Sequence, residues 1–366
     1  MKIGIPKEIK KEEYRVGLIP GTAKEYIDNG HSVIVESGAG MGIGFSDEDY
    51  KNNGCKITND KKKLFDDVEM IIKVKEPLPE EYDLFHEGQI LYTYLHFAAS
   101  KKLTQAMLDK KIFGFAYETL TEKDGSLPLL IPMSQIAGRM SVQEGAKYLE
   151  KPFGGRGVLL GGVPGIKKGK VVIIGGGVAG TNACKIAVGI RADVTIMDIS
   201  AKRLSELDDI FGASITTLYS TPTNIKEAIK DADLVIGAVL IPGAAAPKLI
   251  MKEDLKTMKK GAVIVDIAVD QGGCVETTKP TFHTDPVFVI DDIVHYCVAN
   301  MPGAVALSST LALTSVTNRY GIQLANLGVE TAIKQSEPLR TALNVYKGKL
   351  VNAPVAQAHN MKYEEI

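Results

Sequence analysis

The first third of the chain alternates short hydrophobic runs with amphipathic stretches. Strands are predicted for the aliphatic and β-branched runs at 2–6, 31–36, 70–74, 89–96 and 112–118. Residues 22–30 form a predicted helix that ends at Asn29-Gly30, because glycine readily adopts the left-handed conformation that stops a helix. This rhythm of strand, helix and strand predicts an α/β fold with a parallel sheet.

A second series of strands follows a glycine-rich passage. Residues 128–150 contain a helical pattern with Ser134 as its predicted N-cap, and we place the linker between two domains here. Beyond the glycine-rich residues 153–169, strands are predicted at 171–175, 193–198, 215–219, 233–240, 262–270 and 287–292. Six strands with intervening helices predict a complete doubly wound sheet. Residues 301–366 show a helical pattern without strand partners, so they must pack on a domain that is already built.

Length, charge and cysteine content exclude several classes of protein. A chain of 366 residues is too long to fold around one compact core, and its length predicts about two domains. A formal net charge of −1, from 43 basic and 44 acidic residues, argues against nucleic-acid binding. No apolar stretch suits a signal peptide or a membrane span, so we expect a soluble cytoplasmic protein. The four cysteines form no C-x-x-C pair, and we expect reduced, mostly buried thiols.

One glycine-rich turn has the spacing of a dinucleotide-binding motif. VVIIGGGVAG contains G-x-G-x-x-G as Gly175, Gly177 and Gly180, directly after a predicted strand and at the start of a predicted helix. The next strand ends in Asp198, at the spacing where an acid binds the adenosine ribose. Its carboxylate would repel a 2′-phosphate and favours NAD over NADP, although Arg203 nearby could accommodate that phosphate. The alternative is a purely structural glycine turn.

Ligands of doubly wound sheets bind beyond the carboxyl ends of the strands. In the second series these positions are Val239-Leu240, Ala268 to Asp270, and Val298 to Met301. Asp270 is the only ionisable side chain among them, on a loop that Gly272 and Gly273 leave free to bend. The alternative for Asp270 is an ordinary turn-forming aspartate.

Four further side chains, two of them in one motif, carry charge or proton-transfer chemistry whose role the pattern alone leaves open. Lys73 and Lys75 in MIIKVKEPLP share one strand face, either on a half-solvated edge strand or with Lys75 holding an anion at the mouth of a site. His96 ends a predicted strand, and it is either a satisfied core histidine or a catalyst. Arg15, taken alone, is most often a solvated charge. One base, two cations and a nicotinamide site together favour an enzyme.

Eight motifs follow one another in order: KEEYRVGLIP, IIKVKEPLPEEY, LYTYLHFAAS, PMSQIAGRMSVQEGA, GGRGVLLGGVPG, ADLVIGAVLIPGAAAPKL, VDIAVDQGGC and YCVANMPGAV. Together they resemble the bacterial alanine dehydrogenase family, from residue 1 to about residue 335. The soluble nucleotide-binding part of proton-translocating transhydrogenase and the saccharopine-type dehydrogenases share the two-domain plan. Missing membrane segments argue against the transhydrogenase.

The resemblance implies NAD-dependent, reversible oxidative deamination of L-alanine to pyruvate and ammonia, with a role for each candidate residue. Arg15 would bind the substrate carboxylate, and Lys75 would bind that carboxylate and the developing carbonyl oxygen. His96 would be the general acid/base, for which a reference pKa near 6.5 is suited at neutral pH. Asp270 would orient the water or amine, and Asn300 with Met301 would border the same pocket.

The resemblance also implies a set of cofactor contacts. These fall on Ser134, Gly175, Gly177, Val178, Ala179, Gly180, Asp198, Arg203, Ser220, Val239, Leu240, Ile267, Ala268, Val269, Asp270, Lys279, Val298, Ala299, Asn300 and Met301. Lys279 stands where other members can carry arginine, and lysine cannot copy a bidentate arginine contact. Some members bind magnesium through Glu and His near the long late helix, but this chain has Gln323 and Leu327 there, so no metal is expected.

The implied architecture is α/β, with two Rossmann-like doubly wound domains and a cleft between them. Residues 1–130 with 305–366 would form a discontinuous substrate domain, and residues 131–304 would form the NAD-binding domain. Members are commonly hexamers, so we expect a homo-oligomer that acts on L-alanine, pyruvate and ammonium, without nucleic acid or membrane. The alternatives are a related dehydrogenase for another small amino or imino acid, and a non-catalytic NAD-binding relative. The proton-transfer residues argue against the latter.

Overall fold

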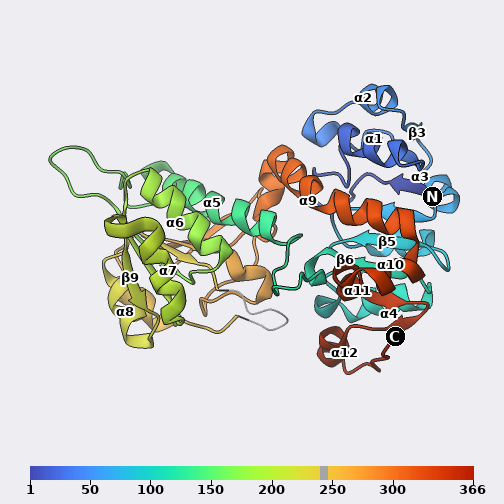
Figure 1. The fold of residues 1–366 in the computed structure, drawn as a ribbon. Coiled ribbons are helices and arrows are strands. Elements are labelled where there is room, and N and C mark those ends of the chain that lie inside the picture. Colours follow the sequence, from blue (N-terminus) through green and yellow to red (C-terminus); the bar gives the residue numbers. More distant parts are fainter. Residues whose placement is uncertain (240–245) are drawn as a thin grey trace. The chain divides into compact units, whose positions relative to one another are not determined.

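The chain folds into two compact units, each built on one sheet (Figure 1). The computed structural model describes residues 1–239 and 246–366. Met1–Met133 and Val305–Ile366 form the first unit, and Ser134–Ala304 form the second. The predicted α/β fold with a discontinuous first part is confirmed, because strands from the C-terminal segment complete the first sheet.

The first unit holds an eight-stranded sheet in the order β15-β14-β6-β5-β4-β1-β2-β3. Its strands are β1 (Lys2–Ile5), β2 (Ser32–Glu36), β3 (Lys56–Thr58), β4 (Met70–Ile72), β5 (Ile90–Thr93), β6 (Phe113–Ala116), β14 (Leu343–Tyr346) and β15 (Lys349–Leu350). Strands β1 to β6 pair in parallel, whereas β14 and β15 pair antiparallel at one edge. The order reverses at β1, which lies between β2 and β4.

Helices from both ends of the chain accompany this sheet. They are α1 (Pro20–Asp28), α2 (Asp47–Asn52), α3 (Lys61–Asp67), α4 (Lys101–Asp109), α9 (Ala306–Leu327), α10 (Val329–Gln335), α11 (Glu337–Ala342) and α12 (Ala353–His359). Helix α9 lies beside α1 in Figure 1, and the close approach requires Gly321, where a Cβ would stand 2.0 Å from the Tyr26 hydroxyl. The late helices thus dock on the first unit.

The prediction that residues 301–366 contain no strand is wrong. Strands β14 and β15 form a hairpin, and β14 pairs with β6. Its turn consists of Lys347 and Gly348, which both have positive φ, as a type I′ hairpin turn requires. The strands are too short to show a periodic pattern, because β15 contains only two residues.

The second unit holds a seven-stranded sheet in the order β12-β13-β11-β10-β7-β8-β9. Its strands are β7 (Lys170–Ile174), β8 (Asp193–Asp198), β9 (Thr216–Tyr219), β10 (Leu234–Gly237), β11 (Val263–Asp266), β12 (Val287–Ile290) and β13 (Ile293–Tyr296). The accompanying helices are α5 (Ile131–Tyr148), α6 (Val178–Gly189), α7 (Ala201–Phe211) and α8 (Pro222–Lys230). This is the doubly wound order of a Rossmann sheet with one antiparallel edge strand, β12.

Two local expectations for this unit are wrong. The sequence pattern predicts the sixth strand at 287–292, but that segment is β12, which pairs antiparallel; the sixth parallel strand is β13, which follows a turn where Asp291 and Asp292 adopt positive φ. Ser134 does not cap a helix, since α5 already begins at Ile131. The first turn of α5 contains Pro132, which is tolerated there because early helix amides need no partner.

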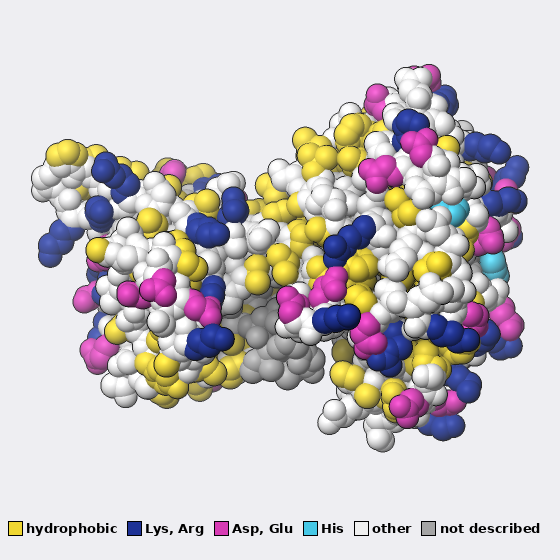
Figure 2. Space-filling view, in the orientation of Figure 1, with side chains coloured by type: hydrophobic (Ala, Val, Ile, Leu, Met, Phe, Trp, Pro, Cys, Tyr) yellow, Lys and Arg dark blue, Asp and Glu magenta, His cyan; other side chains and the backbone are white. Residues whose placement is uncertain are grey.

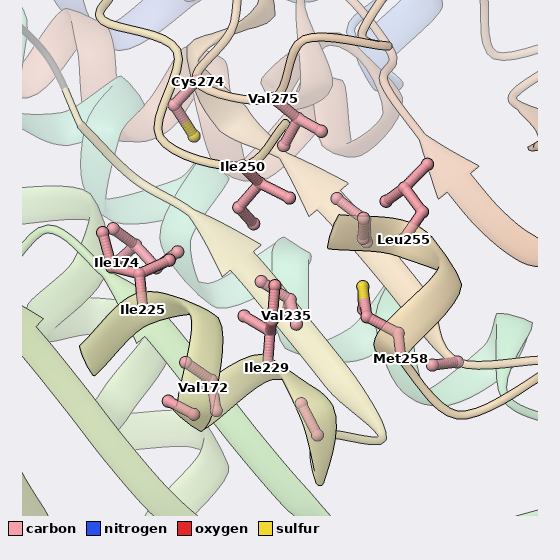
Figure 3. Close-up of a cluster of buried hydrophobic side chains, with 14 of the residues drawn as sticks. Val172, Ile174, Ile225, Ile229, Val235, Ile250, Leu255, Met258, Cys274 and Val275 are labelled. Atoms are coloured by element: carbon pink, nitrogen blue, oxygen red, sulfur yellow. The ribbon is translucent and has the colours of Figure 1, made fainter. Parts of the chain in front are cut away.

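The core of the second unit lies between its parallel strands and neighbouring segments. Val172 and Val235, from adjacent strands, pack with Ile225 and Ile229 of α8, together with Met258 (Figure 3). Strands that are buried on both faces need continuous apolar runs, which is why β7, β10 and β11 are rich in valine and isoleucine.

The surface carries mixed charge. Figure 2 shows one face on which Lys and Arg side chains lie interspersed with Asp and Glu side chains, in agreement with the net charge of −1. Within residues 1–239 and 246–366, every helix is too short or too polar to cross a membrane.

Candidate active site

The candidate substrate residues of the first unit follow the carboxyl ends of its parallel strands. Arg15 lies in the segment after β1, Lys75 follows β4, and His96 follows β5. Strands β1 and β4 are neighbours, but the chain continues from β1 to β2 on the opposite side. Loops diverge at such a reversal of strand order, and ligands of open α/β sheets bind there.

Arg15 is buried and bound to Glu13. Its Nε donates to Oε1 of Glu13 at 2.7 Å, and its Nη2 donates to Oε2 at 2.6 Å. Its Nη1 lies 3.1 Å from Sδ of Met133. Burial raises the pKa of the Glu13 carboxyl, but the hydrogen bonds and charge of Arg15, helped by Lys75, outweigh this effect and lower that pKa to about 2. Glu13 is therefore ionised and fixes the orientation of the guanidinium.

Lys75 is also buried, and its backbone is bound from two sides. Its N–H donates to Oε1 of Glu8 at 3.2 Å, and its carbonyl accepts from Oγ1 of Thr93 at 3.2 Å. The edge-strand interpretation is wrong, because β4 lies between β5 and β1. Lys73 is fully buried, with its Nζ 3.1 Å from Glu8 and 3.0 Å from Glu81. Lys73 is thus a structural ion-pair partner, and Lys75 remains the candidate anion ligand.

His96 occupies a turn at the end of β5. Its φ of 49° and ψ of 34° place it in the left-handed region, which few residues other than glycine adopt. Oε1 of Glu118 accepts its backbone N–H at 2.6 Å, and the same carboxylate accepts from the N–H of Leu95 at 3.2 Å. The imidazole stacks on Tyr94, with ring centroids 5.8 Å apart and planes at 10°. The residue is half-buried.

Electrostatic effects connect these residues into one cluster. Burial raises the pKa of the Glu76 carboxyl, but His96 and further cations, Lys75 among them, outweigh this effect and lower the pKa. Burial raises the pKa of the Tyr94 hydroxyl, and the charge of Arg15 opposes the rise. Arg15 and Lys75 thus act on the same carboxylate, Glu13, and Lys75 and His96 act on the same carboxylate, Glu76.

The sequence pattern did not single out the acidic partners Glu8, Glu13, Glu76 and Glu118. Acidic residues in loops are usually solvated, so their position alone carries no signal. One signal was available for Glu13, which stands two residues from Arg15 in KEEYRVG. The others depend on contacts between distant segments, such as Glu8 with Val74.

The glycine motif of the second unit has the geometry of a dinucleotide turn. Gly175 has a φ of 104°, a conformation that residues with side chains rarely adopt. A Cβ on Gly180 would lie 1.8 Å from the carbonyl oxygen of Gly175, so only glycine allows α6 to begin this close to β7. Gly177 is the N-cap of α6, and Val178 and Ala179 begin its first turn. Amides there have no partner within the helix and suit a diphosphate.

Asp198 ends β8 beside this turn. Its Oδ2 accepts the N–H of Gly176 at 2.7 Å, and its Oδ1 accepts the N–H of Ser200 at 2.8 Å. The carboxylate therefore fixes the glycine turn through a hydrogen bond, and its oxygens can accept further hydrogen bonds from a ligand. Ribose hydroxyls would be bound at this position, and a 2′-phosphate would be repelled.

Arg203 of α7 points back to the same turn. Its Nε donates to the carbonyl oxygen of Gly176 at 2.8 Å, and its Nη2 donates to Oγ1 of Thr181 at 2.7 Å. Its Nη1 lies 2.7 Å from the carboxylate of Glu206. The guanidinium thus supports the turn, and Glu206 adds a second negative charge. These groups fit NAD better than NADP.

The loop after β11 is anchored by a buried aspartate. Asp266 accepts from the N–H of Ala268 at 3.1 Å, the N–H of Cys274 at 2.9 Å and Oγ1 of Thr278 at 2.6 Å. Asp270 lies on the short turn Ile267–Gln271 within this loop and is exposed. The anchored loop thus presents an exposed carboxylate at the carboxyl end of the sheet, where a ligand would bind.

The other predicted cofactor residues mostly follow strands of the second unit: Ser220 after β9, Val239 after β10, Ile267 to Val269 after β11, and Val298 to Met301 after β13. Leu240 lies outside the described residues. Ser134 lies in the first part of α5, and Lys279 lies over the ring of Phe288 at 4.7 Å. His295 lies in β13 and is a fully buried core histidine whose ring contacts Thr277 and the Ile293 carbonyl.

The described residues contain no group of three or more His, Cys, Asp or Glu side chains that could hold a metal ion. Gln323 and Leu327 both lie on α9. An amide and an aliphatic side chain make a poor ligand set for magnesium, which prefers carboxylates and water.

The comparisons with known proteins identify the family. Residues 4–137 match the domain described as Alanine dehydrogenase/PNT, N-terminal domain, and residues 141–353 match Alanine dehydrogenase/PNT, C-terminal domain. The chain belongs to the alanine dehydrogenase/PNT family. The family expected from the eight motifs is thereby confirmed.

Relatives in the alanine dehydrogenase/PNT family match over the full chain. Alanine dehydrogenase 2 of Staphylococcus aureus (strain USA300) is 55% identical, over 100% of this chain and 98% of its own length. A solved structure named L-alanine dehydrogenase has a TM-score of 0.95 at 50% identity and covers 98% of this chain and 99% of its own. A transhydrogenase structure from Sinorhizobium meliloti, with a TM-score of 0.82 at 22% identity, covers 96% of this chain and 99% of its own and shares the fold.

Proposed function

We propose that the protein catalyses the NAD-dependent, reversible oxidative deamination of L-alanine to pyruvate and ammonia. The observation that carries this proposal is the 55% identity to an alanine dehydrogenase along the whole chain. The residues add the chemistry that the reaction needs: cations for a carboxylate, a histidine for proton transfer and a dinucleotide turn.

Two cations are proposed to bind the substrate carboxylate. Arg15, oriented by Glu13, would bind it through the guanidinium, and Lys75 would bind the carboxylate and the oxygen that forms at Cα. A charge on a fixed backbone stabilises that oxygen most as it develops, because little reorganisation is then needed. Arg15 would thus act mainly in binding, and Lys75 in binding and in the chemical step.

His96 is proposed as the general acid/base. In deamination its neutral imidazole would take the proton from water as it adds to the iminium carbon, and would help the carbinolamine to lose ammonia. Tyr94 and Glu118 would hold the ring and its backbone in position. Asp270 would orient the water or the amine.

NAD, when bound, accepts the hydride from Cα of the substrate. Its diphosphate would lie on the first turn of α6, where Gly177, Val178 and Ala179 offer backbone amides, and Asp198 would bind the adenosine ribose. The other predicted residues after β9, β10, β11 and β13 would line the remaining length of the dinucleotide. Productive transfer needs cofactor and substrate in register, and such orientation can contribute about 7–11 kcal/mol.

We assign the first unit as the substrate domain and the second as the NAD-binding domain. The resemblance supports a homohexamer, and exposed apolar side chains at Leu159, Val163 and Ile166 offer contact area to another copy. The four buried, unpaired cysteines suit a reducing cytoplasm. Light scattering of the purified protein measures the assembly.

The test is a panel of L- and D-amino acids with NAD or NADP, followed by nicotinamide absorbance. L-alanine with NAD should give the highest kcat/KM, and pyruvate with ammonium and NADH should give the reverse reaction. Turnover of another small amino or imino acid in preference to alanine would support the related dehydrogenase instead. NAD binding without turnover of any substrate would support a non-catalytic relative.

A further inference from the structure

One carboxylate, that of Glu8, binds the backbone N–H groups of Val74 and Lys75. Oε1 of Glu8 accepts the N–H of Val74 at 2.6 Å and the N–H of Lys75 at 3.2 Å. Strand β1 ends at Ile5, so the carboxylate stands where a longer neighbouring strand would offer carbonyl oxygens. One side chain thus binds two successive amides just beyond β4.

The charge of this carboxylate is balanced inside the protein. Oε2 of Glu8 lies 3.1 Å from Nζ of Lys73, and Oε1 of Glu81 lies 3.0 Å from the same nitrogen. Burial raises the pKa of Glu8, and the charge of Lys73 opposes this rise. A buried ammonium between two carboxylates keeps each carboxylate in place, because separating them would leave an unpaired buried charge.

The opposite side of Lys75 is bound from β5. Oγ1 of Thr93, a fully buried residue, donates to the carbonyl oxygen of Lys75 at 3.2 Å. The peptide groups on both sides of the Lys75 Cα are therefore bound, one by Glu8 and one by Thr93. The backbone direction at Lys75 is fixed, and its side chain starts from a defined point.

We propose that Glu8 is a positioning residue for the reaction, which acts through the backbone of Lys75 and is held by Lys73. The proposal rests on the proposed function, in which Lys75 binds the substrate carboxylate and the developing oxygen. A displacement of about 1 Å at a reacting group can cost about 10²-fold in rate. A loosened Lys75 backbone should therefore slow the reaction without changing any group that contacts substrate.

The test compares Glu8→Gln with Glu81→Gln. Both carboxylates accept from Lys73 and from backbone amides, since Oε2 of Glu81 accepts the N–H of Leu78 at 3.1 Å. Both variants remove one charge from the same ion-pair cluster, but only Glu8 contacts the amide of Lys75. The two variants should lose similar thermal stability. Only Glu8→Gln should lower kcat/KM for pyruvate, by about 10-fold to 100-fold and mostly in kcat, with the KM for NADH unchanged.

A second variant keeps the test valid if Glu8→Gln does not fold. Thr93→Val removes the hydroxyl that binds the Lys75 carbonyl, without a change in charge and with little change in size. It should also lower kcat for pyruvate, by about 3-fold to 10-fold. Near-normal kcat in a folded Thr93→Val protein would overturn the proposal that the Lys75 backbone must be held.

A double variant shows whether Glu8 acts through Lys75. In a Lys75→Ala background, Glu8→Gln should cause no further fall in kcat, because the positioned group is already absent. A full additional fall would overturn the proposal. If Lys75→Ala loses activity while Glu8→Gln matches Glu81→Gln, this inference fails and the proposed function stands. If Lys75→Ala keeps full activity, the assignment of Lys75 is wrong and the inference fails with it.

Discussion

Glu13 and Arg15 form a buried pair joined by two parallel hydrogen bonds, Nε to Oε1 at 2.7 Å and Nη2 to Oε2 at 2.6 Å. The side chains are only 0% and 2% exposed, respectively. Removing one member of a buried pair leaves an unpaired charge and costs about 3–5 kcal/mol. Substitutions at this pair must therefore be judged by stability and kinetics together.

Arg15→Lys separates charge from shape at this position. Lysine keeps a cation for Glu13 but lacks the planar fork, so the substrate carboxylate should be bound less well. We expect the KM for alanine and pyruvate to rise about tenfold, with a smaller change in kcat, as for lost uniform binding. Steady-state kinetics and thermal melting measure both effects. Unchanged KM values would show that Arg15 does not bind substrate.

The ionisation of Glu13 should make stability depend on pH. Its folded pKa of about 2 lies below the ordinary value of 4.5. The stabilisation is therefore fully present above pH 4.5 and is lost as the pH falls toward 2. This shift corresponds to about 3 kcal/mol. The difference in unfolding free energy between wild type and Glu13→Gln should shrink steadily from about pH 5 to pH 3 in urea titrations. A constant difference would contradict the ionised pair.

Cofactor choice should depend on two carboxylates. Wild-type protein should strongly prefer NAD, because Asp198 repels a 2′-phosphate. Asp198→Ala should improve relative use of NADP, but it should also weaken NAD binding, since the Gly176 N–H loses its acceptor. The gain in relative use of NADP should stay small, because Glu206 is paired with Arg203 and its negative charge remains beside it.

The double variant Asp198→Ala/Glu206→Gln tests this interpretation. It frees one end of the Arg203 guanidinium and removes the second negative charge. Its kcat/KM for NADP should exceed the product of the two single effects, as expected for coupled neighbours. Strictly additive effects would show that Glu206 and Asp198 are not coupled in cofactor choice. Equal turnover of NADP and NAD by the unmodified protein would show that Asp198 does not determine cofactor choice.

Much of the fold could be predicted because its signals are local. The βαβ rhythm and the glycine turn before Asp198 depend on residues within one segment, and the structure has both. Strands β14 and β15 carry no such signal, because their short runs become strands only through pairing, β14 with β6 and β15 with β14. Tertiary pairing here overrides a weak local pattern.

The candidate site also contains residues whose positions follow from local sequence signals and residues whose positions depend on distant parts of the chain. Lys75 and His96 could be placed near strand ends from the hydrophobic pattern. The burial of Lys73 could not be predicted, because it depends on two carboxylates at once, and one of them, Glu8, lies 65 positions away along the chain. Edge and interior strands with similar residues differ only in their neighbours, which a single sequence does not reveal.

His96→Asn tests proton transfer while keeping the turn. Asparagine tolerates the left-handed conformation that residue 96 adopts at φ 49°, so fold and NAD binding should survive. Turnover should fall about 10²–10⁴-fold, the usual range for one general acid/base. In wild type, kcat/KM for alanine should fall on acidification, because deamination needs a proton acceptor, whereas pyruvate amination needs a proton donor.

The control for this experiment is Glu118→Gln. The amide oxygen can still accept one backbone N–H, but the negative charge that binds the turn at 2.6 Å is lost. Its rate should fall less than that of His96→Asn, because the base is still present but held less firmly. The acidic limb of the pH–rate profile should therefore persist in Glu118→Gln and disappear in His96→Asn. If His96→Asn instead keeps near-normal turnover with the same acidic limb, another group carries the proton, and Asp270 becomes the next residue to substitute.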